Sequence, residues 1–332
     1  MKKVFVTGAS GFIGYHLIRK LRSRNIEVRC LIRSTSEVSH LAAFNAEYCT
    51  GDLTSPDRLA EAVAGCDTVF HLAGLVRARK YAEFESVNRD GTRNLAQAAA
   101  ECPAPPVFVY VSSLAAAGFA APNNPKRETD SPMPVSGYGK SKLAGENALL
   151  PFAGRLPCTV IRPGIVFGGR DKMGVELFKA VKRLGFCPNP GWTAKYYSWV
   201  HAEDLAELLT AAAERGERLA QGAPAGTGIY FASGGAGQRF SDICKMIGES
   251  LHRRVRPFLI PPAAVWGVAM YYEMRQRLIG CSQPFDWDKA GESLRHWCCS
   301  PKKAETQLNF SPLPLQERFR QTVQWFQENG WL

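Results

Sequence analysis

A tyrosine and a lysine, Tyr138 and Lys142, stand four positions apart in a segment with a helical pattern. This spacing places both side chains on one face of a helix. A free tyrosine, with a pKa of about 10, is a poor base at neutral pH, but a nearby ammonium group favours its phenolate. Such a phenol can give a proton to a carbonyl oxygen or take one from an alcohol. Taken alone, the pair is also common on solvated helix faces, so its meaning depends on its surroundings.

A glycine-rich segment near the start of the chain reads Thr7-Gly8-Ala9-Ser10-Gly11-Phe12-Ile13-Gly14. Gly8 permits a tight turn, Gly11 lets backbone N–H groups approach a pyrophosphate, and Gly14 allows close packing of a helix on a strand. The segment follows a strand-like run and opens a helix-like run, which is the context that a dinucleotide site requires. It therefore predicts a dinucleotide cofactor, whose oxidised, cationic ring would also favour the Tyr138 phenolate.

The end of the second expected strand bears on the choice between NAD and NADP. A site that prefers NAD usually carries an acidic residue there, which binds the ribose 2′-OH. Here Ile32 stands at that position and Arg33 follows it. An arginine can bind a 2′-phosphate with a forked geometry, whereas an acid would repel it. We therefore expect NADP; the alternative is that Arg33 only stacks on the adenine, so that NAD binds as well.

Strand-like and helix-like segments alternate through the first half of the chain. Strands are expected at 4–7, 27–33, 46–50, 68–71, 107–112 and 159–162, and helices at 12–24, 58–64, 84–101 and 138–150. This alternation predicts repeated βαβ units and a parallel sheet. Right-handed crossovers then give an α/β fold, a doubly wound parallel sheet of the Rossmann type.

The pattern changes after about residue 170. Helices are expected at 204–214, 240–251, 260–280 and 315–329, and loops rich in glycine and proline at 183–194 and 221–228. We therefore expect a dinucleotide-binding domain at 1–170, with segments around 195–232 returning to it, and a smaller C-terminal lobe at 171–332 that mostly binds substrate.

Further motifs follow the glycine turn in order. They are Gly51-Asp52-Leu53, His71-Leu72-Ala73-Gly74, Asn88-Arg89-Asp90-Gly91-Thr92, Ser112-Ser113, Tyr138-Gly139-Lys140-Ser141-Lys142, Arg162-Pro163-Gly164 and Val200-His201-Ala202-Glu203-Asp204-Leu205. Together with the turn they cover roughly residues 3–205, and the chain resembles the extended short-chain dehydrogenase/reductase superfamily, the NAD(P)-dependent epimerase/dehydratase family.

The resemblance implies roles for particular residues. It implies that Tyr138 is the acid/base and that Lys142 binds the cofactor ribose. It also implies that Ser113, five residues before Gly118, hydrogen-bonds the substrate oxygen. Asn88 would support this site from the fourth helix. The implied cofactor-binding residues are Gly8, Ser10, Gly11, Phe12, Ile13, Gly14, Arg33, Asp52, Leu53, Leu72, Ala73, Gly74, Tyr138, Lys142, Pro163 and Val166.

Departures from the family patterns bear on the substrate. Leu114-Ala115 replaces the acidic pair of the dehydratases, and the arginines with which epimerases hold a sugar-nucleotide diphosphate have no clear match. The region expected to cover the substrate is instead rich in apolar side chains, which suit an apolar ligand. They are Trp192, Tyr196, Tyr197, Trp199, Trp266, Met270, Tyr271, Tyr272 and Met274. In this respect the chain resembles the 3β-hydroxysteroid dehydrogenase and dihydroflavonol reductase branch.

The residues and the resemblance together predict an NADP-dependent oxidoreductase. It would transfer hydride between the nicotinamide and a carbonyl or secondary alcohol of a hydrophobic substrate that is sterol-, ketone- or flavonoid-like. One alternative is a sugar-nucleotide epimerase that uses the same triad with tightly bound NAD. Another is a non-catalytic protein that senses dinucleotides.

Composition narrows the partners and the location. In 332 residues, 45% of them hydrophobic, no stretch reaches the roughly 18 uncharged apolar residues of a spanning helix. A strand-like run begins almost at Met1, so a signal peptide is not expected and a cytoplasmic location is. The net charge of +11 comes from scattered basic residues, which does not favour nucleic acid. The basic cluster 252–256 beside the apolar run 258–272, followed by Met274 and Arg277, leaves a peripheral membrane contact or a homodimer open.

The ten cysteines have no CxxC spacing, and the six histidines form no metal-binding motif. Cys30, Cys158 and Cys244 stand singly among apolar residues, where buried reduced thiols are expected. We therefore expect neither a disulfide scaffold nor a structural metal site.

Overall fold

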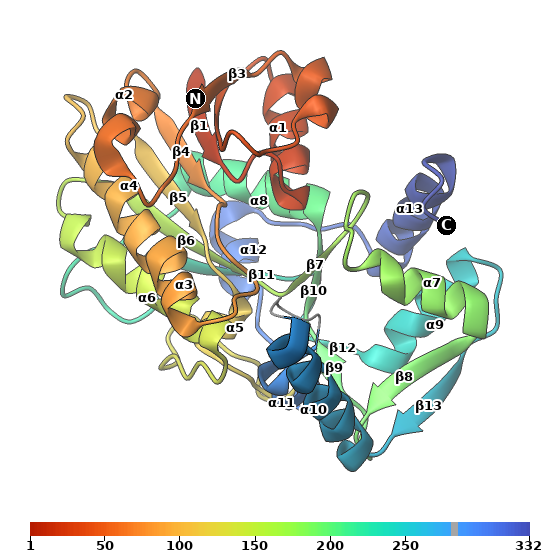
Figure 1. Ribbon diagram of the computed structural model, residues 1–332. Coiled ribbons are helices and arrows are strands. Elements are labelled where there is room, and N and C mark those ends of the chain that lie inside the picture. The colour runs from red at the N-terminus through yellow and green to blue at the C-terminus, as the bar shows by residue number, and fades with distance from the viewer. Residues whose placement is uncertain (280–284) are drawn as a thin grey trace.

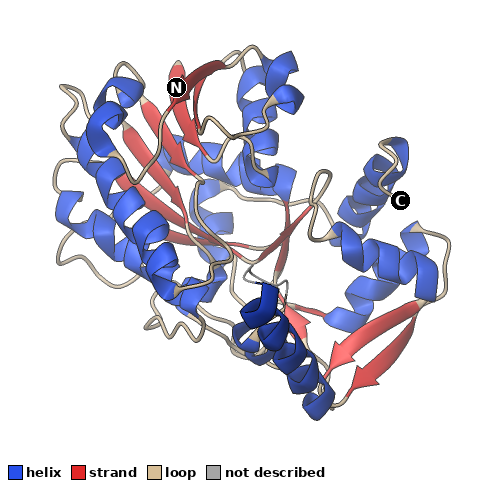
Figure 2. Ribbon diagram, viewed as in Figure 1, coloured by secondary structure: helices blue, strands red, loops and turns tan. Residues whose placement is uncertain are grey.

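A seven-stranded parallel sheet forms the centre of the molecule in the computed structural model, which describes residues 1–279 and 285–332 except the side chain of residue 277 (Figures 1 and 2). The strand order is β11-β6-β5-β4-β1-β2-β3. The strands are β1 (Lys3–Thr7), β2 (Glu27–Ile32), β3 (Glu47–Thr50), β4 (Thr68–His71), β5 (Val107–Val111), β6 (Cys158–Pro163) and β11 (Ile229–Ala232). The order reverses between β1 and β4, which opens a crevice at the carboxyl ends of these two strands. The expected doubly wound fold is confirmed.

Helices cover both faces of this sheet. They are α1 (Phe12–Ser23) and α8 (Ala202–Arg215) on one face, and α2 (Leu59–Val63), α4 (Gly91–Ala100) and α6 (Gly137–Leu149) on the other. Side chains of β1 point alternately to the two sides: Val4 and Val6 pack with Leu17 of α1, and Phe5 packs with Leu95 of α4. Strands buried on both faces in this way read as continuous apolar runs, which is why the sheet could be predicted.

Most elements of the C-terminal lobe pack around an apolar cluster to which Leu114, Phe167 and Phe231 also contribute. The elements of this lobe are α7 (Val175–Leu184), β8 (Phe186–Pro190), α9 (Phe240–Ser250), β13 (Arg256–Ile260), α10 (Pro262–Ile279), α11 (Trp287–Ser293) and α13 (Leu315–Glu328). The Phe319 ring of α13 stacks on the Phe167 ring, with centroids 4.2 Å apart, and this contact joins the lobe to the crevice. No helix in the described part of the chain is both long and apolar enough to span a bilayer.

Short elements connect the two parts. They are α3 (Tyr81–Phe84), α5 (Leu114–Ala117), β7 (Ile165–Phe167), β9 (Tyr196–Tyr197), β10 (Trp199–His201), β12 (Gln238–Arg239) and α12 (Lys302–Leu308). β7 pairs in parallel with β10, and β9 pairs in an antiparallel way with β12. These small sheets lie between the central sheet and the lobe (Figure 1).

Three local expectations are corrected by the structure. Residues 183–194 are not all loop, because β8 pairs along its whole length with β13, Phe186 opposite Arg256. The helix expected at 84–101 is broken by a π-helical turn, Glu85–Asp90, between α3 and α4. Cys244 is not a reduced thiol but forms a disulfide with Cys187, because β8 and α9 bring together two residues that are 57 positions apart.

The expected helix 260–280 corresponds to α10. Gly280 and the side chain of Arg277, which that expectation included, lie outside the described part of the chain.

Candidate active site

The glycine turn lies between the end of β1 and the start of α1. Gly8 has a φ of +71°, and a Cβ there would lie 2.7 Å from the backbone N of Ala73. A Cβ at Gly14 would lie 2.7 Å from the carbonyl O of Ala9, so α1 approaches the turn closely. Gly11 is the N-cap of α1 and has no side chain to occupy the first N–H groups of the helix. The turn thus leaves an open, electropositive helix end, which fits the pyrophosphate of a dinucleotide.

A cavity of about 300 Å³ lies in front of this turn. It contains nine of the sequence-predicted residues, namely Gly8, Ser10, Gly11, Arg33, Asp52, Leu53, Leu72, Ala73 and Gly74. Arg33 is exposed at the end of β2. The Asp52 carboxylate accepts hydrogen bonds from the Thr54 N–H at 2.8 Å and the Thr54 hydroxyl at 2.7 Å, and these bonds lower its pKa. The shape and the lining fit the adenosine half of the cofactor.

A second cavity, of about 460 Å³, continues from the first and shares Leu72, Gly74 and Leu75 with it. Its lining contains most of the remaining predicted residues: Phe12, Ile13, Ser113, Tyr138, Lys142, Pro163 and Val166. The two cavities form one groove along the carboxyl ends of the strands, where ligands of doubly wound folds bind. Of the predicted residues, Gly14 and Asn88 are not part of this lining.

Tyr138 and Lys142 lie in the first turns of α6. The helix starts at this point because the Ser136 hydroxyl caps it, accepting a hydrogen bond from the Gly139 N–H at 3.1 Å. The Lys142 ammonium donates to the carbonyl O of Val111 at 2.7 Å and lies 4.3 Å from the centroid of the Tyr110 ring. Burial lowers the pKa of Lys142 to about 7, although the Glu146 carboxylate partly opposes this shift.

The Tyr138 phenol differs from the sequence-based expectation. Burial raises its pKa to about 12, the hydrogen bond with Ser113 lowers it, and the Glu292 carboxylate raises it further. The side chains of the protein therefore keep the phenol protonated, because burial outweighs the hydrogen bond. The lysine that should acidify it is itself too deeply buried to remain a full cation at neutral pH.

Ser113 and Ser112 have different neighbours. Ser113 caps α5, where its hydroxyl accepts from the Ala115 N–H at 3.1 Å, and it borders the groove beside Tyr138. The Ser112 hydroxyl instead donates to the Glu146 carboxylate at 2.5 Å. That carboxylate also holds the buried Arg162 guanidinium, with contacts of 2.9 and 2.6 Å. Ser113 therefore lies beside Tyr138 at the groove, whereas the Ser112 hydroxyl belongs to a buried ionic network behind it.

Asn88 does not line the groove but contacts segments that form its wall. It lies in the π-helical turn rather than in a regular fourth helix. Its side chain accepts from the Leu75 N–H at 2.8 Å and donates to the Leu75 carbonyl at 2.9 Å and to the Ser141 hydroxyl at 2.8 Å. It therefore fixes the loop after β4 against α6, and with it one wall of the groove.

A third cavity, of about 350 Å³, opens beyond Tyr138 and shares Ser113, Tyr138, Pro163, Gly164 and Ile165 with the groove. Its further lining is mostly apolar: Leu114, Ala115, Tyr197, Phe285 and Trp297, with Lys289, Glu292 and Ser293 on one side. Such a space beside a proton donor fits an apolar substrate.

The aromatic set predicted to cover the substrate is mostly elsewhere. Of that set, Tyr197 borders the cavity. Trp199 packs in the core against Phe319, whereas Trp192 is 67% exposed and Tyr271 is 57% exposed. Phe285 and Trp297 supply the aromatic wall instead. No local signal separates these two from other aromatics, because they reach the site only through the packing of the lobe.

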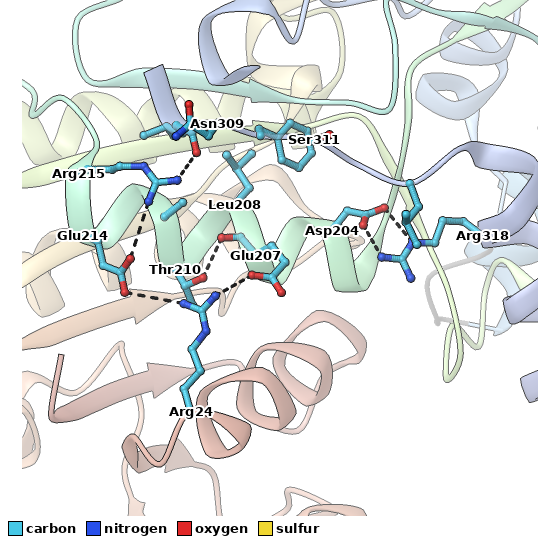
Figure 3. Close-up of a pocket in the computed structure, with 14 residues that line it drawn as sticks. Arg24, Asp204, Glu207, Leu208, Thr210, Glu214, Arg215, Asn309, Ser311 and Arg318 are labelled. Atoms are coloured by element: carbon cyan, nitrogen blue, oxygen red, sulfur yellow. Dashed lines mark hydrogen bonds and ion pairs between the residues drawn. The ribbon is translucent and has the colours of Figure 1, made fainter. Parts of the chain in front are cut away.

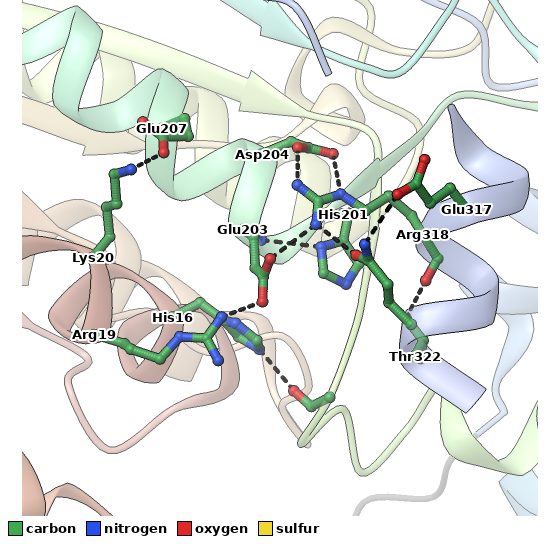
Figure 4. Close-up of polar contacts among 12 residues, drawn as sticks. His16, Arg19, Lys20, His201, Glu203, Asp204, Glu207, Glu317, Arg318 and Thr322 are labelled. Atoms are coloured by element: carbon green, nitrogen blue, oxygen red, sulfur yellow. Dashed lines mark hydrogen bonds and ion pairs between the residues drawn. The ribbon is translucent and has the colours of Figure 1, made fainter. Parts of the chain in front are cut away.

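Two polar cavities on the other side of the central sheet do not resemble a substrate site. One, of about 390 Å³, lies between α8, α13 and the loop after α12, and its cations are paired: Arg24 contacts Glu207 at 2.9 Å and Glu214 at 3.8 Å (Figure 3). Beside the other, Arg318 contacts both Asp204 and Glu203 (Figure 4). Their charges are used to hold α1, α8 and α13 together.

Comparisons with known proteins identify the family and the fold of this chain. The model of the NAD dependent epimerase/dehydratase family matches residues 4–224. A ceramide reductase from Caulobacter vibrioides is 28% identical over 330 residues, which cover 99% of this chain and 96% of that protein. A decarboxylating sterol-4-alpha-carboxylate 3-dehydrogenase from Dictyostelium discoideum is 28% identical, over 82% of this chain and 86% of that protein. The crystal structure of a UDP-glucose 4-epimerase from Thermotoga maritima has a TM-score of 0.77 and 22% identity, over 98% of this chain and 99% of that chain, which shows the shared fold.

Proposed function

Because the chain belongs to the NAD dependent epimerase/dehydratase family and is an oxidoreductase of the extended short-chain type, we propose that it interconverts a carbonyl and a secondary alcohol on a hydrophobic substrate, with NADP as the cofactor. The observation that carries this proposal is the junction at Tyr138 and Ser113, where the groove along the strand ends meets the apolar cavity. A carbonyl carbon placed there would face the cofactor on one side and the phenol on the other.

In this proposal Tyr138 supplies the proton. The bound cofactor supplies the hydride in reduction. The Ser113 hydroxyl holds the substrate oxygen, and the Tyr138 phenol donates its proton to that oxygen as negative charge develops there. The raised pKa of Tyr138, about 12, keeps the phenol protonated at neutral pH, which is the state that reduction requires.

Lys142 has the position to orient the cofactor ribose and to replenish the proton. Its ammonium lies in the lining of the groove, one helical turn from Tyr138, and is held by the carbonyl of Val111. A pKa of about 7 lets it bind or release a proton near neutrality. Because the Lys142 ammonium is buried, the protein offers it few hydrogen-bond acceptors. Oxygen atoms of a ligand in the groove would therefore accept further hydrogen bonds from it.

The preference for NADP depends on Arg33. This side chain is exposed at the rim of the adenosine cavity, directly after Ile32, and no acidic residue occupies the end of β2. The nearest carboxylate in that lining, Asp52, is already hydrogen-bonded to Thr54. A 2′-phosphate at this rim would meet the Arg33 cation, although the ionised Asp52 carboxylate, which also feels the charge of Arg33, lines the same cavity.

The lining of the third cavity favours an apolar substrate over a sugar nucleotide. Among the described residues that line it, Lys289 is the single cation, and it is already paired with Glu292 at 2.7 Å. A diphosphate would need several cationic or N–H partners. The names of the relatives, a ceramide reductase and a sterol dehydrogenase, support the same class of substrate.

We also propose that α10 rests on an anionic lipid surface, from which a water-insoluble substrate would enter. The inner face of α10 packs on α11 through Val265, Ala269 and Ala290, and α11 borders the substrate cavity. The outer face exposes apolar side chains, namely Val268, Met270, Tyr271, Met274 and Leu278. Exposed arginines at 253, 254 and 256 lead directly into this region and complement anionic headgroups.

Co-sedimentation with vesicles tests this contact. Binding to vesicles that contain phosphatidylglycerol, weaker binding to pure phosphatidylcholine, and loss of binding in the variant Tyr271→Ser/Met274→Ser would support it. Equal sedimentation of that variant and the wild type would contradict it.

A cofactor oxidation assay tests the function itself. With NADPH, the protein should reduce long-chain or polycyclic apolar ketones, and UDP-glucose should undergo no epimerisation. Epimerisation of a sugar nucleotide without net change in the cofactor, together with no reduction of any apolar ketone, would replace this proposal by the epimerase alternative.

A further inference from the structure

We propose that Glu292 of α11 forms a hydrogen-bond-accepting subsite in the substrate cavity, for an amide N–H or hydroxyl next to the reacting carbonyl. This inference rests on the proposed function and specifies its substrate class further. The substrate would be an apolar ketone that carries a hydrogen-bond donor beside its carbonyl group.

Among the described residues, the protein supplies a hydrogen-bond donor to only one of the two carboxylate oxygens of Glu292. Its Oε2 accepts from the Lys289 ammonium at 2.7 Å. Its Oε1 is buried and has no hydrogen-bond partner among the residues that the structure describes. The side chain is only 14% exposed and borders the cavity. A buried carboxylate oxygen without a donor is costly, so its presence in a ligand cavity indicates that a bound molecule supplies the donor.

The position of α11 is fixed against the catalytic helix. The Asp288 carboxylate accepts a hydrogen bond from the N–H of Gly137, the first residue of α6, at 2.7 Å. The Trp297 indole N–H donates to the main-chain O of Glu292 at 2.8 Å, and the Tyr197 hydroxyl donates to the carbonyl of Ser293 at 3.0 Å. These bonds attach α11 to the start of α6 and to the cavity wall, and so fix the main chain that carries the acceptor.

The acceptor lies close to the reacting centre rather than at the far end of the cavity. The Lys289 ammonium, which holds Glu292, is 5.8 Å from the centroid of the Tyr138 ring. The charge of Glu292 is also felt by the Tyr138 phenol, whose pKa it raises. The donor group should therefore stand on a carbon adjacent to the carbonyl, and not on a distant part of an alkyl chain.

The ion pair explains why the acceptor suits a neutral donor. Lys289 compensates the carboxylate, so a further cation on the substrate is not required. An N–H or O–H group satisfies Oε1 without adding charge to an otherwise apolar space. A substrate that lacks a donor would leave this oxygen desolvated and unpaired, and would bind less well.

A matched pair of substrates tests the subsite. One is a long-chain ketone with an N-acylamino group on the adjacent carbon, and the other is its ester isostere, with oxygen in place of N–H. With NADPH, the wild type should show a kcat/KM about tenfold higher or more for the amide, which corresponds to about 1.4 kcal/mol. Glu292→Leu should reduce the ratio of kcat/KM for the amide to that for the ester to about one, whatever the change in the absolute rates, and Glu292→Gln, which retains an acceptor, should keep a preference for the amide.

The outcomes separate the subsite from the proposed function. Equal turnover of amide and ester by the wild type would overturn the subsite and leave the function intact, as would an unchanged preference in Glu292→Leu. If Glu292→Leu does not fold, Glu292→Ala, which also removes the acceptor, takes its place: loss of the preference for the amide supports the subsite, and an unchanged preference overturns it. Turnover of no ketone at all, with cofactor bound, would remove the function and the subsite together.

Discussion

The groove beside Tyr138 and the interface between α1, α8 and α13 both bury charged groups, but they treat them in opposite ways. In the interface, each charged group named above contacts a group of opposite charge. Arg318 contacts Asp204 and Glu203, and Arg24 contacts Glu207 (Figures 3 and 4). In the groove, the Lys142 ammonium is held by a main-chain carbonyl, and in the adjoining substrate cavity Oε1 of Glu292 has no donor among the described residues. Paired charges hold elements together, whereas the buried Lys142 ammonium, which is held by a main-chain carbonyl, has a lowered pKa and remains available to a ligand.

Removal of one partner in the interface should have the largest effect on stability. Arg318→Met leaves Asp204 buried without its guanidinium, and the free energy of unfolding should fall by about 3–5 kcal/mol. Denaturant unfolding measures this, with Arg320→Met, an exposed residue of the same helix, as the control. Equal stability of the two variants would mean that the interface is not held by its charges.

Lys142, in contrast to the paired Arg318, should make the folded protein less stable where its amine is protonated in the unfolded chain. Burial lowers its pKa from 10.5 in the unfolded chain to about 7, so between these values the unfolded state binds a proton that the folded state lacks. This group therefore makes the folded protein gain stability as the pH rises from 7 to 9, by about 2 kcal/mol.

In Lys142→Met that gain should disappear while cofactor oxidation falls by about a hundredfold or more. Unfolding of the cofactor-free protein at both pH values measures the stability change, with Lys140→Met, exposed on the same helix, as the control. A pH dependence of stability that is the same in Lys142→Met and the wild type would show that the amine is not perturbed.

Arg33 should have the smallest effect, because it is exposed at the rim of the groove. Arg33→Ala should lower kcat/KM for NADPH by about tenfold to a hundredfold, the value of one or two charge-assisted hydrogen bonds, and leave that for NADH within about twofold. Arg58→Ala, exposed and outside the cavity lining, is the control. A similar decrease in kcat/KM for NADPH and for NADH would indicate that Arg33 stacks on the adenine instead.

The parts of the site that depend on local spacing could be predicted from the sequence. Gly8 and Gly14 indicate the turn, because a Cβ at either position would clash with the nearby backbone. Tyr138 and Lys142 share a helical face because they are four residues apart. The apolar runs of β1 and β5 likewise indicate the parallel sheet. Each of these signals is contained within a few consecutive residues.

The parts that depend on long-range packing could not be predicted. Glu292 and Trp297 reach the cavity about 150 residues after Tyr138 along the chain, and nothing near them marks that destination. The Cys187–Cys244 disulfide has no spacing signal either. The sequence predicts that the Lys142 ammonium and a cationic cofactor ring favour the Tyr138 phenolate, whereas burial, which a sequence does not display, has the largest effect on the pKa values of both Tyr138 and Lys142.

The measurement that tests the central claim most directly is a single turnover of bound NADPH with an apolar ketone, in the wild type and in Tyr138→Phe, which keeps the ring and removes only the hydroxyl. At saturating NADPH the rate of cofactor oxidation should fall by about 10²–10⁴-fold, while the variant remains folded and still binds the cofactor. A rate within about twofold of the wild type would show that the proton comes from elsewhere and would contradict the role of the phenol.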